Sequence, residues 1–497
     1  MPRSESLRTS AVLLGFAGMI EFALQMAIPI LLARYLDEIT FAQYRLLWLL
    51  AGTALAIAPM FMPQSLFYFL SRARRRRKAS YIGNVLLFLT AAGTLSALVA
   101  SDLNPWLQQA ALDLFRDSAG LSAAFLALWV MASMLDVLPT ADGRAAWQAG
   151  AIIGLAVLRT VLLAAAALFA GDIYWIAVVM LAVASAKLLL LAVYMRRFIA
   201  RTDSEWDLAL LRTQVMYAFP FAIGHTLFLL RVQADQWVVV SMLPTAMYAT
   251  FSVAAVILPI GTLIRQPVNN ALLPRLNKVF GAGDKAQAAR LIALSNGASG
   301  MLLIPVAGAL FACAPELVEL VYTRRYIEAA PVMRVYLIGL MITAIAVGHT
   351  LSALGHGRFA AINSAVCLAL SIVLCVTLTR QFGMAGAAAG SMIALAVGEL
   401  WGLLVVARTL HSSALRLINW HSLLPAILAT AFALLMVEWV TGDRTLAPWN
   451  MLLAKAGVYC VAFVPVFLLA GGWRAATELA GFRKDKAVVE GGAHETA

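Results

Sequence analysis

The stretch AVLLGFAGMIEFALQMAIPILL, residues 11–32, decides the class of fold. It is almost entirely apolar, and a helix of about 20 such residues crosses the roughly 30 Å hydrocarbon core of a bilayer. A short basic segment precedes it, and no small-residue cleavage site follows at the distance typical of a signal peptide. We therefore expect this stretch to be a retained first membrane helix.

Apolar stretches of this length recur along the whole chain. Of the 497 residues, 62% are hydrophobic and 12% are charged, and the mean hydropathy is +0.86. A soluble protein has about a quarter of its residues charged, and a membrane β-barrel shows alternating segments of about ten residues. The composition therefore predicts an all-α polytopic membrane protein.

We expect about fourteen transmembrane helices, joined by connections too short to hold a soluble domain. They lie at about 11–33, 44–69, 80–100, 119–139, 149–170, 173–195, 215–242, 247–268, 291–312, 332–353, 359–379, 384–406, 421–440 and 449–470. Most of the 37 Lys and Arg residues fall on one side of these helices, which places both termini in the cytoplasm. The same bias explains the net charge of +12 without a nucleic-acid partner.

An internal repeat predicts two lobes. LDEITFAQY at 36–44 aligns with LPTAMYATF at 243–251, and this offset of 207 residues moves the first helix onto the seventh. We expect two pseudo-symmetric six-helix lobes around a central cavity, plus two C-terminal helices. The expected boundaries are 1–200, 201–410, 411–470 for the two extra helices, and 471–497 for a cytoplasmic tail.

Several charged residues fall inside the expected spans. Each costs about 2.5–3.5 kcal/mol at the centre of a bilayer, so such residues normally face a protein interior or water. Polar Gln25 and His225 accompany them. The charged residues are Glu21, Arg159, Lys187, Arg231, Asp235, Arg265 and Glu399.

The basic members of this set predict a path for an anion. A diphosphate carries about two negative charges, and arginine can hold it through two hydrogen bonds. We expect Arg159, Lys187, Arg231 and Arg265 to line a cavity for it. Arg231 could instead form a structural ion pair with Asp235, one helical turn away, and Arg265 could extend to the membrane surface.

The acidic and polar members suggest a second role. Glu21, Asp235 or Glu399 could carry H⁺ or Na⁺, with Gln25 as a polar neighbour in the cavity, whereas downhill transport needs no coupled ion. Glu399 could also make a hydrogen bond between packed helices. No P-loop motif is present and the histidines show no ligand spacing, so we expect no nucleotide, metal or other cofactor.

The order of motifs resembles the polysaccharide transporters, or O-antigen flippases, of the multidrug/oligosaccharidyl-lipid/polysaccharide (MOP) exporter superfamily. Asp235 in LLRVQADQWVVV matches the aspartate of their seventh helix. In YLDEITFAQY, Ala42 stands where these transporters usually have a glycine. In ELVELVYTRRYIEAAPVMRVY, Thr323 stands where they have another glycine. Further matching stretches are LLPRLNKVFGAGD, ELVELVYTRRYIEAAPVMRVY, SALGHGRFAAIN and RQFGMAGAAAGSMIA.

This resemblance implies alternating access and a cargo. The cargo would be an oligosaccharide on a polyprenyl diphosphate, moved from the cytoplasmic to the periplasmic leaflet of a bacterial inner membrane for exopolysaccharide, capsule or O-antigen assembly. Membrane lipids, a polymerase and other export proteins would be partners. A lipid II flippase and a cation-coupled small-molecule exporter of the same superfamily are the alternatives.

Other classes fit the sequence less well. A glycan polymerase or ligase needs catalytic loops or a DxD motif, which the sequence lacks, so we expect a transporter that is not an enzyme. A non-transporting scaffold would leave the intramembrane charges unexplained. The sequence leaves open which glycan is carried, whether an ion is coupled, and the oligomeric state.

Overall fold

The structure, a computed structural model, describes residues 7–73, 75–101, 119–199, 208–442, 444 and 446–477. Within these ranges the regular secondary structure is entirely helical, which confirms the expected all-α class. Most of the expected cytoplasmic tail, 471–497, lies outside the described residues. The chain divides into two compact units, residues 1–252 (unit 1) and 253–497 (unit 2).

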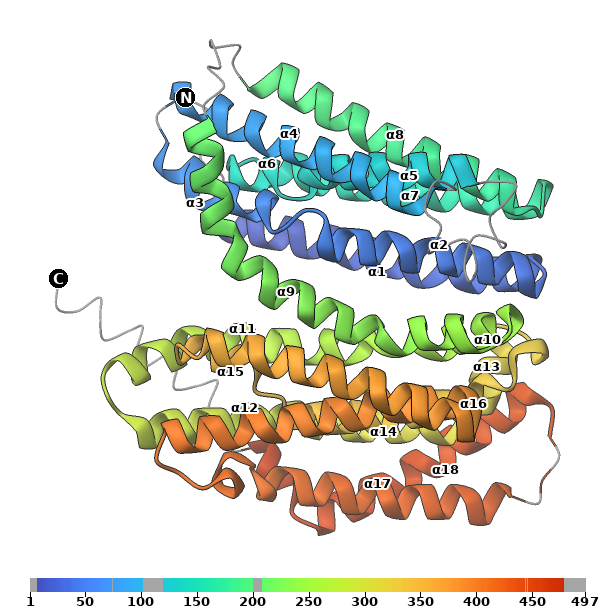
Figure 1. The fold of residues 1–497 in the computed structure, drawn as a ribbon. Coiled ribbons are helices and arrows are strands. Elements are labelled where there is room, and N and C mark those ends of the chain that lie inside the picture. The colour runs from blue at the N-terminus through green and yellow to red at the C-terminus, as the bar shows by residue number, and fades with distance from the viewer. Residues whose placement is uncertain are drawn as a thin grey trace. The chain divides into compact units, whose positions relative to one another are not determined.

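Unit 1 is a helical bundle, drawn from blue to green in Figure 1. Its buried core includes Leu66, Val85, Met134 and Leu191. The helices are α1 (Leu7–Tyr35), α2 (Glu38–Ile57), α3 (Met62–Arg72), α4 (Arg75–Ala100), α5 (Ala119–Ala132), η1 (Ser133–Asp136), α6 (Leu138–Ala141), α7 (Ala145–Phe169), α8 (Ile173–Phe198), α9 (Leu208–Met242) and the greater part of α10 (Thr245–Ala255).

Helix α9 packs on α2, α3 and α4 within unit 1. Thr53 of α2 donates a hydrogen bond to Gln233 of α9 (2.8 Å) and accepts one from Trp237 Nε1 (2.9 Å). Thr226 also donates to the Ala56 carbonyl at 2.6 Å. The units thus divide at 252/253, whereas we expected lobes of 1–200 and 201–410, and that assignment of lobes stays a prediction.

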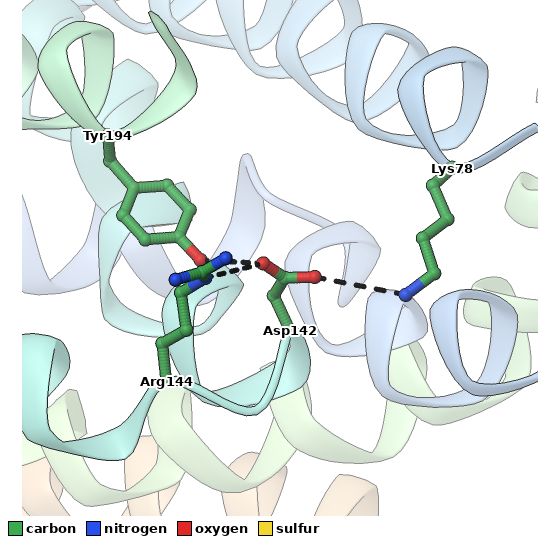
Figure 2. Close-up of polar contacts among 4 residues, drawn as sticks. All are labelled: Lys78, Asp142, Arg144 and Tyr194. Atoms are coloured by element: carbon green, nitrogen blue, oxygen red, sulfur yellow. Dashed lines mark hydrogen bonds and ion pairs between the residues drawn. The ribbon is translucent and has the colours of Figure 1, made fainter. Parts of the chain in front are cut away.

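Asp142 accepts two hydrogen bonds and forms an ion pair with a lysine (Figure 2). The Tyr194 hydroxyl of α8 and Arg144 Nε at the start of α7 donate to Asp142 Oδ2 at 3.0 and 3.2 Å. Lys78 Nζ of α4 lies 3.8 Å from Asp142 Oδ1. Arg144 also lies over the Phe198 ring, with Cζ 4.0 Å from its centroid. The turn between α6 and α7 is thereby joined to α4 and α8.

Unit 2 is drawn from green to red in Figure 1. One of its cores includes Leu276, Ile292, Leu351 and Val406. The helices are α11 (Pro259–Gly281), α12 (Lys285–Ala312), α13 (Ala314–Val321), η2 (Arg324–Tyr326), α14 (Ala329–Ile342), η3 (Thr343–Ile345), α15 (Gly348–Ala353), α16 (Gly357–Thr409), η4 (Ala414–Leu417), α17 (Trp420–Thr441) and α18 (Pro448–Leu469).

Element α16 is a hairpin of two helices. Gly383, with φ +59° and ψ −138°, interrupts it, since a residue with a Cβ rarely adopts this conformation. Small residues then let the two arms approach closely, and a Cβ on Gly390 would lie 2.5 Å from the Cys375 backbone nitrogen. Glycine is therefore required both at the bend and in the contact.

The described chain contains eleven helices that could each cross a membrane, or twelve if the bent pair α2 and α3 forms one span. We expected about fourteen. The expected helices 359–379 and 384–406 are the two arms of α16, and the expected helix 332–353 is interrupted after α14 by η3. The multi-pass membrane class is confirmed, and the count depends on how these interrupted helices are treated.

Candidate functional site

Unit 1 brings four of its charged residues into one region. Arg159 of α7 and Lys187 of α8 are buried, with 7% and 6% exposure. Glu21 of α1 is partly buried and interacts electrostatically with Arg159, Asp136 and Lys187. The fourth charged residue is Asp136. We call these four residues, together with Trp48 and Trp129, the Arg159 cluster. Helix packing of α1 on α7 and of α7 on α8 creates it.

Lys187 has a carboxylate partner. Its Nζ lies 2.7 Å from Asp136 Oδ2, and 4.5 Å from the centroid of the Trp129 ring. Asp136 ends η1, the 3₁₀ turn that interrupts the helical path between α5 and α6. The Lys187 side chain is 7% exposed and that of Asp136 is 54% exposed, so the pair runs from the interior of the bundle toward its surface.

Arg159 lies against an aromatic wall. Its Cζ is 5.3 Å from the centroid of the Trp48 ring, and Trp48 packs edge to face on Trp129 with centroids 5.5 Å apart. A cation over a tryptophan face is stabilised by the ring quadrupole. The wall therefore compensates part of the cost of burying the guanidinium.

The hydrogen bonds of this region are incomplete. Arg159 Nε and Nη2, Trp48 Nε1 and Trp129 Nε1 are buried and have no hydrogen-bond partner among the described residues. The fully buried Tyr44 lies beside Trp48 and Arg159, and its hydroxyl does not reach hydrogen-bond geometry with Trp48 Nε1. Unpaired buried donors are costly, so a site lined by them favours an acceptor-rich or anionic group.

Gln25, one turn after Glu21, is exposed at the surface of unit 1. It shares the Glu21 side of α1, but it is exposed where Glu21 is partly buried. The structure therefore brings Glu21, Arg159 and Lys187 together and does not bring Gln25 into the same buried region.

The structure gives Arg231 and Asp235 different contacts, and their roles in a cavity stay predictions. Within the described chain these two residues form no ion pair: Arg231 Cζ lies 5.3 Å from the Phe228 ring centroid, while buried Asp235 Oδ1 accepts from the Gln236 backbone N–H at 2.8 Å. Helical side chains point toward the N-terminus, so Arg231 reaches back to residue 228. A basic residue followed by an acid at i+4 is also the less favourable order.

Arg265 of α11, in unit 2, is surrounded by protein acceptors. Its guanidinium donates to the carbonyls of Thr343 (2.8 Å), Ala344 (2.6 Å) and Ala346, and to Asn296 Oδ1 at 3.1 Å. These carbonyls are freed where α14 gives way to η3. Arg265 therefore satisfies a broken helix, and its expected contact with cargo stays a prediction.

Glu399 of α16 completes the same break. Its Oε2 accepts a hydrogen bond from the Val347 backbone N–H at 3.0 Å. This matches the alternative in which Glu399 makes a packing hydrogen bond. In the interrupted segment, Glu399 thus accepts from a backbone N–H, and Arg265 donates to three backbone carbonyls.

Sequence analysis missed three members of the Arg159 cluster. Asp136 lies within the expected span 119–139 and could have been found by a stricter search for charges in each span. Trp48 and Trp129 carry no such signal, because tryptophan is common in membrane helices. Their role depends on which faces of α2 and α5 turn toward α7 and α8.

Known proteins share parts of this sequence and this fold. A family described as polysaccharide biosynthesis protein matches residues 31–331. No curated protein sequence matches the chain.

Several solved membrane transporters share the fold. The lipid II flippase MurJ, in an inward closed conformation, superposes with a TM-score of 0.71 at 13% identity, covering 94% of this chain and 100% of that chain. An inward-facing multidrug resistance MATE family transporter of the MOP superfamily gives 0.62 at 14% identity, covering 81% and 99%. A MOP superfamily transporter from Pyrococcus furiosus gives 0.53 at 16% identity, covering 81% and 96%.

Proposed function

Because this chain belongs to the polysaccharide biosynthesis protein family, a group of MOP superfamily transporters and not of enzymes, we propose that it flips a polyprenyl-diphosphate-linked oligosaccharide. The cargo moves from the cytoplasmic to the periplasmic leaflet of a bacterial inner membrane by alternating access. Both termini lie in the cytoplasm, and the glycan then enters exopolysaccharide, capsule or O-antigen assembly. Polymerases and other export proteins would be downstream partners.

The unpartnered donors of the Arg159 cluster are the observation that supports this proposal. A diphosphate offers many acceptor oxygens and about two negative charges. Arg159 Nε and Nη2 can donate to it as a bidentate pair, and the Trp48 and Trp129 N–H groups can donate beside them. Lys187 adds a second positive charge, at present neutralised by Asp136.

The acids support a further part of the proposal. When a diphosphate reaches Arg159, Glu21 and Asp136 must give up part of their electrostatic interaction with the two cations. Protonation of Glu21 would lower that competition, so among the three acids first considered it is the one placed to couple a proton to the cargo. Glu399 is engaged with the Val347 N–H and is less suited to this role.

Lipid II is the second candidate cargo. It also carries a diphosphate on a polyprenyl chain, so the Arg159 cluster would offer it the same donors. The two cargoes differ in their glycans, and discrimination must then come from contacts with the sugars.

A leaflet-translocation assay in proteoliposomes tests the proposal with a polyprenyl-diphosphate oligosaccharide and, in parallel, with lipid II. Arg159→Gln removes the charge, and Trp48→Phe with Trp129→Phe removes two N–H donors while keeping the rings. Loss of a charge-assisted hydrogen bond should slow translocation by about ten- to a hundredfold. Arg212→Gln, at an exposed position of α9, is the matched control.

Three outcomes would decide the matter. Slower transport in the cluster variants, with the control unchanged and all proteins folded, supports the flippase and its site. Transport that is insensitive to every cluster variant rejects the site. Wild-type protein that moves neither lipid rejects the cargo class and favours the small-molecule exporter.

A further inference from the structure

A cavity of about 440 Å³ opens at one end of unit 2, far in sequence from the Arg159 cluster. It lies where the two C-terminal helices α17 and α18 meet α12 and α14. Its wall combines apolar side chains with three charged ones. The lining residues used below are Phe311, Arg334, Leu434, Leu435, Glu438 and Lys455.

One of the three charges already has a partner. Lys455 Nζ of α18 lies 2.6 Å from Glu316 Oε1 of α13, and both side chains are largely buried, with 15% and 10% exposure. The pair neutralises itself and joins α18 to the rest of unit 2. It therefore leaves little net charge for a ligand.

The other two charges are available. Arg334 Nε donates to the Phe311 carbonyl at 3.2 Å, and Arg334 Cζ lies 5.2 Å from the Phe311 ring centroid. These contacts fix the side chain. Both terminal nitrogens of Arg334 have no hydrogen-bond partner in the described chain. The Glu438 carboxylate is exposed and likewise has no ion pair or hydrogen bond among the described residues. The cavity thus presents one cation and one anion that are not paired with each other.

The surroundings are those of a membrane interface. Leu434 and Leu435 form an apolar wall next to the charges. Trp439 and Trp449, which flank the loop between α17 and α18, are 79% and 60% exposed. Exposed tryptophans at helix ends are typical of the level of the lipid headgroups.

We propose that this cavity binds the headgroup of a zwitterionic phospholipid with a primary ammonium, the chemistry of phosphatidylethanolamine. The phosphate accepts hydrogen bonds from the terminal nitrogens of Arg334, and the ammonium donates to the Glu438 carboxylate. The acyl chains lie along Leu434 and Leu435. This site is separate from the cargo site and does not depend on the proposed flippase activity.

Charge balance separates this ligand from its competitors. An anionic lipid would satisfy Arg334 but would bring a negative charge toward Glu438. A phosphatidylcholine headgroup has the same charges, but its quaternary ammonium has no N–H to donate. The bilayer lipid, and not the diphosphate of a cargo, therefore fits both residues.

Native mass spectrometry of the purified full-length protein tests the proposal, with phosphatidylethanolamine, phosphatidylglycerol and phosphatidylcholine of identical acyl chains, and with a polyprenyl diphosphate. We expect the wild type to bind phosphatidylethanolamine about tenfold more tightly than the other two phospholipids. Glu438→Gln should remove this preference. Arg334→Gln should weaken all three, and Arg474→Gln, exposed and outside the cavity, should change nothing.

The comparison of lipids on wild-type protein needs no variant to fold. Equal binding of the three phospholipids, or tighter binding of phosphatidylglycerol or of the polyprenyl diphosphate, would overturn the proposal. So would an unchanged preference in Glu438→Gln. Failure of translocation in the earlier assay would leave this lipid preference unaffected, so the two proposals fail separately.

Discussion

Replacing Asp142 with alanine should destabilise unit 1 by removing the carboxylate that accepts hydrogen bonds from Tyr194 and Arg144 and pairs with Lys78 (Figure 2). The residue holds the turn between α6 and α7 against α4 and α8. Since Arg159 lies on α7, the same network helps to position the candidate site.

The contacts allow the magnitude to be worked out. Tyr194 is fully buried, and its 3.0 Å hydrogen bond to an ionised carboxylate is worth about 1.5–3 kcal/mol. The Arg144 and Lys78 side chains are 34% and 36% exposed, so each of their ion pairs adds about 0–1 kcal/mol. Asp142→Ala should therefore lower the free energy of unfolding by about 2–4 kcal/mol.

Asp142→Asn separates the hydrogen bond from the charge. Its amide oxygen still accepts from the Tyr194 hydroxyl, so it should cost only about 1 kcal/mol. Tyr194→Phe combined with Asp142→Ala forms a double-mutant cycle, and we expect a coupling energy of about 1–2 kcal/mol.

Equilibrium unfolding in mixed detergent micelles measures these differences. Glu328→Ala provides the control, because Glu328 is exposed and its side chain makes no cap hydrogen bond at the start of α14. The reasoning fails if Asp142→Ala is no worse than this control. It also fails if Asn is as harmful as Ala, or if the cycle shows no coupling.

Three further predictions concern local features. Asp37→Ala should cost about 1 kcal/mol by removing the N-cap of α2. Burial of Asp37 opposes its ionisation, but hydrogen bonds from Thr40 and Ile39 outweigh this and hold its pKa below the usual value for an aspartate. The stability from this cap is therefore present above the pKa of the unfolded state and is lost as the pH falls through the folded pKa, which thermal melts between neutral and acidic pH would show. Gly390→Ala should cost about 1–3 kcal/mol by forcing the arms of α16 apart, whereas Gly457→Ala, with open space around it, should be tolerated in the same melts. Glu399→Gln keeps an acceptor for the Val347 N–H and should preserve both stability and transport, while Glu399→Leu should destabilise; a loss of transport in the Gln variant alone would instead make Glu399 an ion carrier.

Much of the architecture could be predicted from local properties of the chain. The run at 11–32 is long enough to span a bilayer wherever it packs, and α1 covers it. The burial of Arg159 and Lys187 was predictable in kind, because a charge inside a span must face protein or water. The break at 343–347 was not, since no proline or glycine pattern announces it and Arg265 and Glu399 stabilise it from two other helices.

Sequence separation limits which contacts can be predicted. For Arg231 the sequence offered two alternatives, a cavity position or an ion pair with Asp235 on the same helix, and in the structure its guanidinium lies beside the Phe228 ring. The ion pair of Lys187 with Asp136 joins residues 51 positions apart. Nothing in either helix alone indicates that contact.

By itself, the sequence determined that this is a multi-pass helical membrane protein with costly charges inside its spans, because apolar length and charge are properties of each segment. Only the tertiary structure decided which charges share a region: Arg159 and Lys187 with Glu21 and Asp136 in unit 1, and Arg334 with Glu438 in the lining of one cavity. Membrane helices are apolar toward lipid and toward each other, so their sequences carry little mark of the packing face. The choice of face, and with it the chemistry of each site, arises when small residues and aromatic rings from separate helices come into contact.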